Sequence, residues 1–246
     1  DAFNAMADEV QTALDELKAE ESRKSRFVSD VSHELRTPLT AIRGAAETLL
    51  DGDVAEEDAR QFLSTIMRES ERLGRLATDL ITLQRIEGAT GELPISRVDL
   101  AAVAALAAEG LSPLTDGRGV SVTIEGEAPL VLGDKDRLQQ VFGNLIDNAS
   151  RMTPEGGTVT VRLSADGDFT VAEVLDEGPG ITPEDAARVF DRFYRAQPSR
   201  DRSTGGAGLG LAIVAAIVRS HGGTITAAPR AERGSVFTLR LPSLKD

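Results

Sequence analysis

The chain has 246 residues, and its 40 acidic residues against 27 Lys and Arg give a net charge of −13, which argues against nucleic-acid binding. It has no Cys, which excludes disulfides, thiolate zinc sites and cysteine nucleophiles, and its two His argue against a His-rich metal centre. No apolar run approaches the roughly 18 residues that span a bilayer, and no signal peptide is evident, so we expect a cytoplasmic fragment of a longer protein.

The first third of the chain is predicted to form two long antiparallel helices. Apolar residues recur every three or four positions over residues 3–17 and 62–83. The sequence Asp51-Gly52-Asp53 between them is a turn signal. One hairpin buries little core of its own, so we expect a homodimer that closes a four-helix bundle, with packing on the rest of the chain as the alternative.

From Leu93 onward, helical and strand patterns alternate. Helices are expected at residues 100–111, 134–152 and 209–220, with Asp134 as an N-cap. Strands are expected at residues 120–125, 129–132, 159–163, 169–175, 224–227 and 235–241. This pattern predicts an α+β domain in which a mixed or antiparallel sheet lies under helices.

The first cluster that could carry chemistry surrounds His33. Val28, Val31 and Leu35 continue the apolar stripe of the first predicted helix, and His33 falls off this stripe and should face water. An exposed histidine beside an acid can act as a proton shuttle or nucleophile, with Glu34 accepting the imidazole proton. Thr37 lies one turn further along and could hold a water, while Pro38 should bend the helix. The alternative is a solvated surface histidine.

The second cluster lies on the predicted helix at 134–152. Asn144 and Asn148 are four residues apart and share a helix face, with Arg151 nearby. Two amides and a cation there could hold a phosphate-bound Mg²⁺, which prefers oxygen ligands. A pair of Asn residues with only capping or hydrogen-bonding roles is the alternative.

The third cluster follows a predicted strand directly. Asp176 at the strand end could accept a hydrogen bond from an exocyclic amine, and Gly178 and Gly180 would let a ligand ring approach the backbone. Such a pattern alone can also be a simple turn.

The fourth cluster is the glycine-rich stretch 205–211, which leads into a predicted helix. Free N–H groups at a helix start bind phosphate. The residues before it, 191–204, hold four Arg against two Asp, which suits a mobile lid over an anion. A flexible Gly/Ser loop is the alternative.

Together, the order and spacing of these clusters resemble a two-component sensor histidine kinase. The stretches that resemble its motifs are residues 27–40 (H box), 144–149 (N box), 176–180 (G1 box), 190–195 (F box) and 206–211 (G2 box). The resemblance covers nearly all of residues 20–243, and residues 1–7 resemble the end of a HAMP linker.

The resemblance implies a role for each matched residue. His33 would receive the γ-phosphoryl group of ATP, Glu34 would activate it, and Thr37 would position a water for phosphatase activity. Asn148 would ligate Mg²⁺ with Asn144 close by, and Asp176 would hydrogen-bond the adenine amine. The remaining residues assigned to the nucleotide site and its lid are Arg151, Gly178, Gly180, Phe190, Phe193, Tyr194, Arg195, Gly206, Gly208, Leu209 and Gly210.

The resemblance also implies an architecture: a helical hairpin forming a dimeric four-helix bundle, followed by an α/β two-layer sandwich of the Bergerat ATP-binding type. The expected domains are residues 1–20 (linker), 21–92 (dimerisation and phosphotransfer) and 93–246 (ATP binding). The expected partners are a second copy and the receiver domain of a response regulator, with no nucleic acid. The fragment would not touch the membrane, whereas upstream segments would anchor the full-length protein in the bacterial inner membrane.

Two other functions stay open. A degenerate kinase could bind ATP as a scaffold without transferring phosphate, and a gyrase-type ATPase of the same superfamily would activate water with a glutamate. The intact His33, Glu34, Asn148 and Asp176 argue against the first, and the H box argues against the second. The other histidine, His221, is expected to be structural, as a cation at a helix end.

Overall fold

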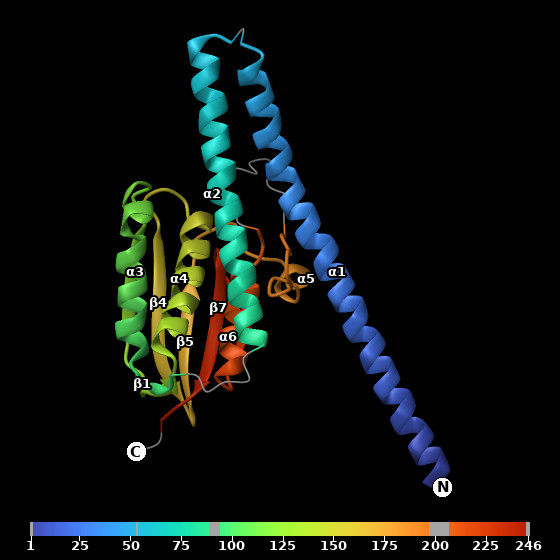
Figure 1. Ribbon diagram of the computed structural model, residues 1–246. Coiled ribbons are helices and arrows are strands. Elements are labelled where there is room, and N and C mark those ends of the chain that lie inside the picture. Colours follow the sequence, from blue (N-terminus) through green and yellow to red (C-terminus); the bar gives the residue numbers. More distant parts are fainter. Residues whose placement is uncertain (1, 53, 89–93, 197–206, 245–246) are drawn as a thin grey trace. The chain divides into compact units, whose positions relative to one another are not determined.

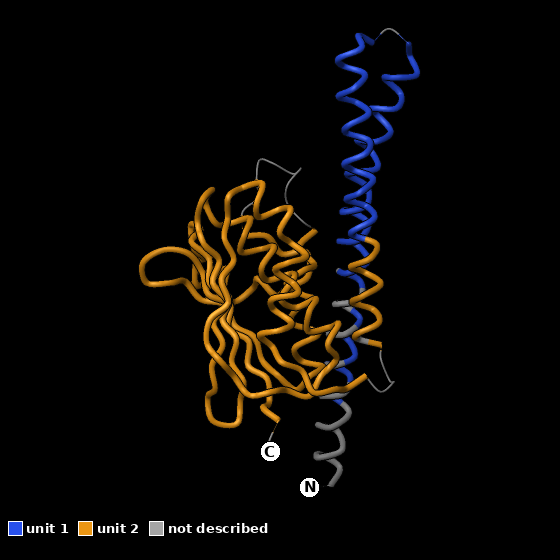
Figure 2. The backbone as a smooth tube through the Cα atoms, turned by 90° about the vertical axis from the view of Figure 1, so that its left-hand side faces the viewer, with its two compact units in different colours: residues 1–76 blue, residues 77–246 orange. Residues whose placement is uncertain are grey.

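The computed structural model describes residues 2–52, 54–88, 94–196 and 207–244 (Figure 1). The chain divides into two compact units, residues 1–76 and 77–246, and each is described by itself (Figure 2). Within the described ranges, no helix is both long enough and apolar enough to cross a membrane. The predicted domain boundaries after residues 20 and 92 remain predictions.

The helical hairpin predicted from the sequence is confirmed. Helix α1 spans Ala2–Leu50 and α2 spans Glu56–Glu87, with Gly52 (φ +81°) turning the chain between them. Helix α1 is continuous through Pro38, so the bend expected at Pro38 stays a prediction. Helix α2 opens with three acidic residues, whose charge suits the positive end of the helix dipole.

Unit 2 is built on a five-stranded mixed sheet of order β2-β4-β5-β7-β6. Only β2 and β4 are parallel, and the other neighbours are antiparallel. The sequence predicts a mixed or antiparallel sheet, and the sheet is mixed; the short strand β1 and its pairing with β3 have no counterpart in that prediction. The strands are β1 Ser96–Val98, β2 Ser121–Gly126, β3 Val131–Gly133, β4 Thr158–Asp166, β5 Phe169–Leu175, β6 Thr224–Pro229 and β7 Ser235–Pro242.

Three helices cover one face of this sheet: α3 Leu100–Asp116, α4 Lys135–Met152 and α6 Gly210–Ser220 (Figure 1). Alternate residues of β7 are buried, as expected for a strand with one covered face. A short helix, α5 Pro183–Ala186, lies in the connection after β5. The largest fully buried side chains of this unit include Phe142, Leu145 and Ile146 on α4, Ile213 and Ile217 on α6, and Leu239 and Leu241 on β7.

Helix α3 runs further than the sequence predicts, past Pro113 to Asp116. Proline removes a backbone donor, which favours an end near residue 111. The hydroxyl of Thr115 donates to the carbonyls of Leu111 and Ser112 at 3.4 and 3.2 Å. These bonds span the proline and lie within the continuing helix.

Candidate functional site

In unit 1, His33 lies on α1 with its side chain exposed, as predicted. Thr37 is also exposed, and its Oγ1 donates a hydrogen bond to the carbonyl of His33 at 3.3 Å. This bond occupies the main chain of His33 and not its imidazole ring. The ring is therefore presented to solvent on the middle of a long helix.

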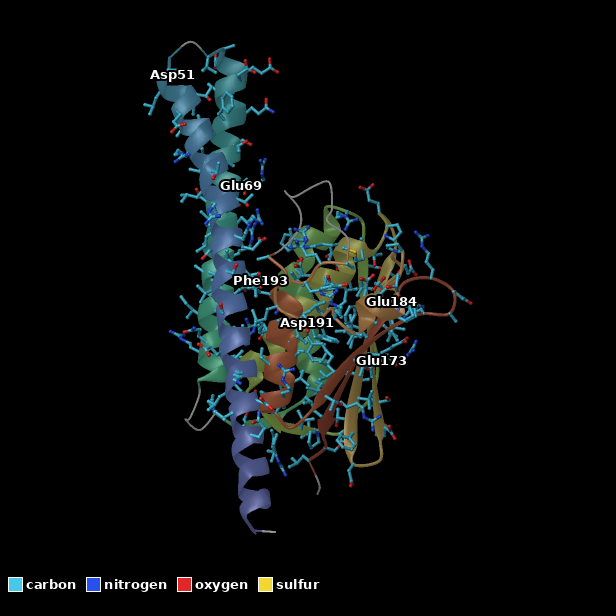
Figure 3. The ribbon with its side chains drawn as sticks, turned by 90° about the vertical axis from the view of Figure 1, so that its right-hand side faces the viewer. Asp51, Glu69, Glu173, Glu184, Asp191 and Phe193 are labelled. Atoms are coloured by element: carbon cyan, nitrogen blue, oxygen red, sulfur yellow. The ribbon has the colours of Figure 1, made fainter. Side chains whose placement is uncertain are left out.

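Glu34 has a partner that sequence reasoning missed. Arg72 on α2 donates from Nη2 to Glu34 Oε2 at 2.8 Å, and its Nη1 lies 3.7 Å from Oε2 of Glu69, which is labelled in Figure 3. The side chain of Arg72 is 12% exposed and that of Glu34 33%, so the pair is partly shielded from water. Glu34 therefore neutralises Arg72 in this conformation, and its role as a base remains a prediction.

In unit 2, α4 carries the predicted site residues Asn144, Asn148 and Arg151. Asn144 is half-buried, and its Nδ2 donates to the carbonyl of Gly210 at 3.2 Å, which ties α4 to the start of α6. Asn148 is also half-buried. Arg151, however, pairs with Asp147 through Nε at 3.0 Å and Nη2 at 2.8 Å. In this conformation Arg151 is therefore held by Asp147, and its role toward a phosphate stays a prediction.

Asp176 follows the last residue of β5 and is 1% exposed. Its Oδ1 accepts a hydrogen bond from the Gly178 N–H at 2.8 Å, whereas its Oδ2 is buried and has no partner among the described residues. Burial raises the pKa of this carboxyl, while the hydrogen bond from Gly178, the neighbouring Ser235 and the charge of Arg230 lower it. An orphaned buried acceptor is costly, so it marks a position where a donor from a ligand would fit.

Two glycines allow the backbone to close around Asp176. A Cβ on Gly178 would lie 2.8 Å from Asp176 Oδ1 and 2.8 Å from the carbonyl of Met152. A Cβ on Gly234 would collide with the carbonyl of Asp176. Side chains at either position would displace the carboxylate or the strand that holds it.

Two arginines from the β6–β7 turn also hold this loop. Arg230 Nη1 donates to the carbonyl of Asp176 at 2.7 Å, and Arg233 Nε donates to the carbonyl of Gly178 at 3.3 Å. The sequence indicates only a turn at residues 230–234. No local spacing signals these contacts, because 54 and 55 residues separate the partners.

The aromatic residues of the predicted F box have distinct positions. Phe190 packs edge-on against Phe237 of β7, with ring centroids 6.3 Å apart. Phe193, labelled with Asp191 in Figure 3, has a φ of 61°, which is unusual for a residue other than glycine. Its N–H donates to the carbonyl of Gly208 at 2.9 Å. This segment is thus fixed to the sheet at one end and to the glycine-rich stretch at the other.

Tyr194 and Arg195 complete that segment. The hydroxyl of Tyr194 donates to Asp185 at 2.5 Å, and this bond lowers the pKa of Asp185 and raises that of Tyr194. The guanidinium of Arg188 lies 4.5 Å from the Tyr194 ring centroid. Arg195 is half-buried just before residues 197–206, which lie outside the described residues. Gly206 and most of the predicted lid fall in that range.

The start of α6 is suited to an anion. Leu209 is fully buried at the N-cap position, and no side chain caps the helix there. Gly210 begins the helix, and the preceding Gly208 has a φ of +74°. Uncapped N–H groups at a helix start favour negative charge.

Side chains from other elements hold both ends of α4. At its start, His221 accepts a hydrogen bond at Nε2 from the N–H of Asp134 at 3.0 Å and donates from Nδ1 to the carbonyl of Ile217 at 2.8 Å. At its end, Arg118 donates to the carbonyls of Ser150 and Thr153 at 2.5 and 3.0 Å. His221 is therefore structural, as predicted, but these contacts require a neutral ring and not the expected cation.

The described residues contain no group of three or more His, Cys, Asp and Glu side chains suited to a metal ion. The predicted Mg²⁺ site does not depend on such a group, because amide and phosphate oxygens are ligands that Mg²⁺ accepts. Asn148 stays the predicted protein ligand.

Two family models match the chain. Residues 133–245 match the model described as histidine kinase-, DNA gyrase B- and HSP90-like ATPase. Residues 23–89 match the His Kinase A (phospho-acceptor) domain.

Among curated relatives, sensor protein SphS of Synechococcus elongatus is 39% identical over 83% of this chain and 51% of its own length. The sensor-like histidine kinase SenX3 of Mycobacterium tuberculosis is 38% identical over 91% of this chain and 55% of its own length. The chain thus spans about half the length of these relatives.

Two of the solved structures that are similar cover most of this chain, and a third covers 61% of it. Histidine kinase AdeS of Acinetobacter baumannii has a TM-score of 0.67 at 28% identity, over 87% of this chain and 98% of that one. The mycobacterial sensor histidine kinase MprB is 31% identical over 61% of this chain and 99% of that one, with a TM-score of 0.53. Histidine kinase ThkA in complex with response regulator TrrA has a TM-score of 0.72 at 24% identity, over 89% of this chain and 61% of that one, which supports the fold.

Proposed function

The chain belongs to the sensor histidine kinases, and we propose on that basis that it transfers the γ-phosphoryl group of ATP to His33 and then to an aspartate of a response regulator. The observation that carries the ATP-binding part is the buried Oδ2 of Asp176, which has no partner in the described part of the chain. The exocyclic amine of adenine is a donor that would satisfy it. An ionised acceptor makes such a hydrogen bond worth about 1.5–3 kcal/mol.

The phosphate end of the site would lie between α4 and the start of α6. Mg²⁺ bound to the phosphates would neutralise charge that develops during transfer, and Asn148 would hold it through its amide oxygen. The uncapped N–H groups at the start of α6 would contact phosphate oxygens. Arg151 would reach them only after leaving Asp147, and an exposed pair of this kind is worth about 1 kcal/mol or less.

The transfer itself needs a neutral imidazole. A ring nitrogen of His33 would attack the γ-phosphorus, forming an N–P bond as the bond to the β–γ bridging oxygen breaks and ADP leaves. The proton on the other ring nitrogen would be accepted by Glu34. The ion pair with Arg72 holds Oε2 of Glu34, so it would compete with this role.

We propose that the hairpin forms a homodimer. Large apolar side chains of unit 1 remain exposed, although they lie at helical spacing. A four-helix bundle would bury them. The large apolar residues of unit 1 with more than half of their surface accessible are Leu17, Val28, Leu39, Leu50, Leu63 and Met67, at 63, 62, 60, 85, 52 and 65%. Sedimentation equilibrium of the chain would test this, and a monomer at micromolar concentration would refute it.

The receiver domain of a response regulator is the proposed partner, because phosphohistidine formed on exposed α1 would be accessible to it. Thr37, exposed one turn from His33, would position a water that removes phosphate from the partner's aspartate. We further propose that segments beyond this chain anchor the whole protein in the bacterial inner membrane. The HAMP-like start at residues 1–7 stays a prediction.

Incubation with γ-labelled ATP and Mg²⁺ tests the proposal, with His33→Gln as the matched variant. The wild type should acquire label that is labile to acid and stable to base, and the variant should acquire none. Label on the variant would refute His33 as the acceptor. Nucleotide binding without any label would favour the scaffold function, and ATP turnover by the variant would favour an ATPase.

A further inference from the structure

The β6–β7 turn lies against the loop that follows β5. The N–H of Asp176 donates to the carbonyl of Ser235 at 3.1 Å, and the N–H of Arg230 closes the turn on the carbonyl of Gly234 at 3.0 Å. Because Gly234 lacks a Cβ, the turn can approach the Asp176 carbonyl directly. The two segments are therefore packed backbone to backbone at the candidate adenine position.

Two guanidinium groups reinforce that contact. Arg230 donates to the Asp176 carbonyl at 2.7 Å and Arg233 to the Gly178 carbonyl at 3.3 Å, so carbonyls two residues apart are held from the same turn. A guanidinium is a rigid, permanently charged donor, which makes such bonds stronger than neutral ones. Neither arginine touches the carboxylate of Asp176 in these contacts.

These contacts determine the direction in which the Asp176 carboxylate points. Both peptide units beside Asp176 are held, its N–H by Ser235 and its carbonyl by Arg230, and its Oδ1 is held by Gly178. Only Oδ2 lacks a partner among the described residues. The charge of Arg230 also lowers the pKa of Asp176 against the effect of burial, which favours the ionised acceptor.

We propose that Arg230, assisted by Arg233, is a positioning residue for adenine specificity: it aims Oδ2 of Asp176 at the exocyclic amine without contacting the nucleotide. The inference rests on the proposed ATP-binding function. The positioning role of Arg230 differs from a general structural role, because loss of Arg230 should weaken recognition of the amine more than binding of the rest of the nucleotide.

The test compares equilibrium binding of ATP with that of purine riboside triphosphate, which lacks the exocyclic amine. We expect the wild type to prefer ATP by about tenfold or more, the factor that corresponds to about 1.4 kcal/mol. Arg230→Met should lose most of this preference by weakening ATP binding about tenfold, while binding of the analogue changes little. Arg230→Lys, which keeps a charged donor, should retain part of it.

Arg240→Met is the matched control. Arg240 is an arginine of β7 that pairs with Asp166 at 2.6 Å, near the opposite end of β5 from Asp176. Its removal should leave the ratio between the two nucleotides unchanged. Thermal unfolding of each variant checks that it is folded, and the ratio is insensitive to a partly inactive sample.

The outcomes distinguish a failure of the proposed ATP site from a failure of the positioning role of Arg230. If the wild type binds both nucleotides equally, adenine recognition by Asp176 is refuted and the proposed ATP site with it. If the wild type prefers ATP and Arg230→Met keeps the same preference, or loses affinity for both nucleotides by the same factor, only the positioning role is overturned.

Discussion

Replacement of Asp176 by Asn should raise the stability of the free protein and lower its affinity for ATP. The substitution keeps the shape of the side chain, and the new amide oxygen can still accept from the Gly178 N–H, so the change is confined to the position of Oδ2. In the wild type that position holds a buried carboxyl oxygen with no partner in the described residues. A neutral amide there is less costly to bury.

The direction of this stability change follows from the pKa of Asp176. Because burial raises the folded-state pKa of Asp176 above its unfolded value of 3.8, the folded state binds the proton more tightly. The destabilisation is absent below the unfolded pKa, grows as the pH rises toward the folded pKa, and is complete above it. At pH 7 the variant should therefore be the more stable protein, and the difference should shrink on acidification.

Stability is expected to rise and ATP affinity to fall, and both changes are large enough to measure. We expect stabilisation of about 1 kcal/mol, the order of one unsatisfied buried group, or about 2–4 °C in the melting temperature of a unit this size. ATP affinity should fall about 10- to 100-fold, because one hydrogen bond to a charged acceptor is lost.

Calorimetric unfolding without nucleotide, repeated from pH 7 toward pH 4, and titration with ATP would measure both effects. Asp166→Asn is the control, since Asp166 is an exposed partner of Arg240. That change should cost at most about 1 kcal/mol and leave ATP affinity unchanged. A destabilised Asp176→Asn variant would refute the reasoning, because it would mean that Oδ2 already has a favourable partner.

Three further predictions rest on individual contacts. Arg72→Met should release Glu34 from an ion pair worth about 1 kcal/mol and speed autophosphorylation up to about fivefold in a labelling time course; a slower reaction would show that Arg72 instead orients Glu34. Gly234→Ala should abolish detectable ATP binding in calorimetry, because its Cβ would collide with the Asp176 carbonyl; unchanged affinity would contradict this. His221→Leu should lower the free energy of unfolding by about 1–3 kcal/mol in denaturant titration, because the N–H of Asp134, the N-cap of α4, loses its acceptor; a smaller loss would mean that water replaces the imidazole.

Local features of the sequence were sufficient for most of the fold. The alternation in β7 and the three- and four-residue spacing in α2 identify buried faces directly. Asp134 was predicted as an N-cap, and its Oδ1 accepts from the N–H groups of Asp136 and Arg137 at 3.0 and 3.1 Å. Each of these signals is complete within a few residues, so no knowledge of the tertiary structure is needed.

The contacts that shape the candidate site could not be predicted in this way. Arg72 meets Glu34 across 38 residues, Arg230 meets Asp176 across 54, and His221 meets the cap of α4 across 87. Their register depends on how helices and strands pack, and an exposed-looking Arg or His has no pattern that names its partner. Individual residue types in the motifs were thus easier to recognise than the residues that hold them.

The contacts of His221 and Arg118 with the two ends of α4 have a thermodynamic consequence for any ligand that binds on the face of this helix. A neutral imidazole at one end and a guanidinium at the other fix the helix that carries Asn144 and Asn148 before anything binds. When a ligand binds this half of the site, the protein loses little conformational entropy, so more of the contact energy is retained as affinity. Small molecules directed at the α4 face would share that advantage.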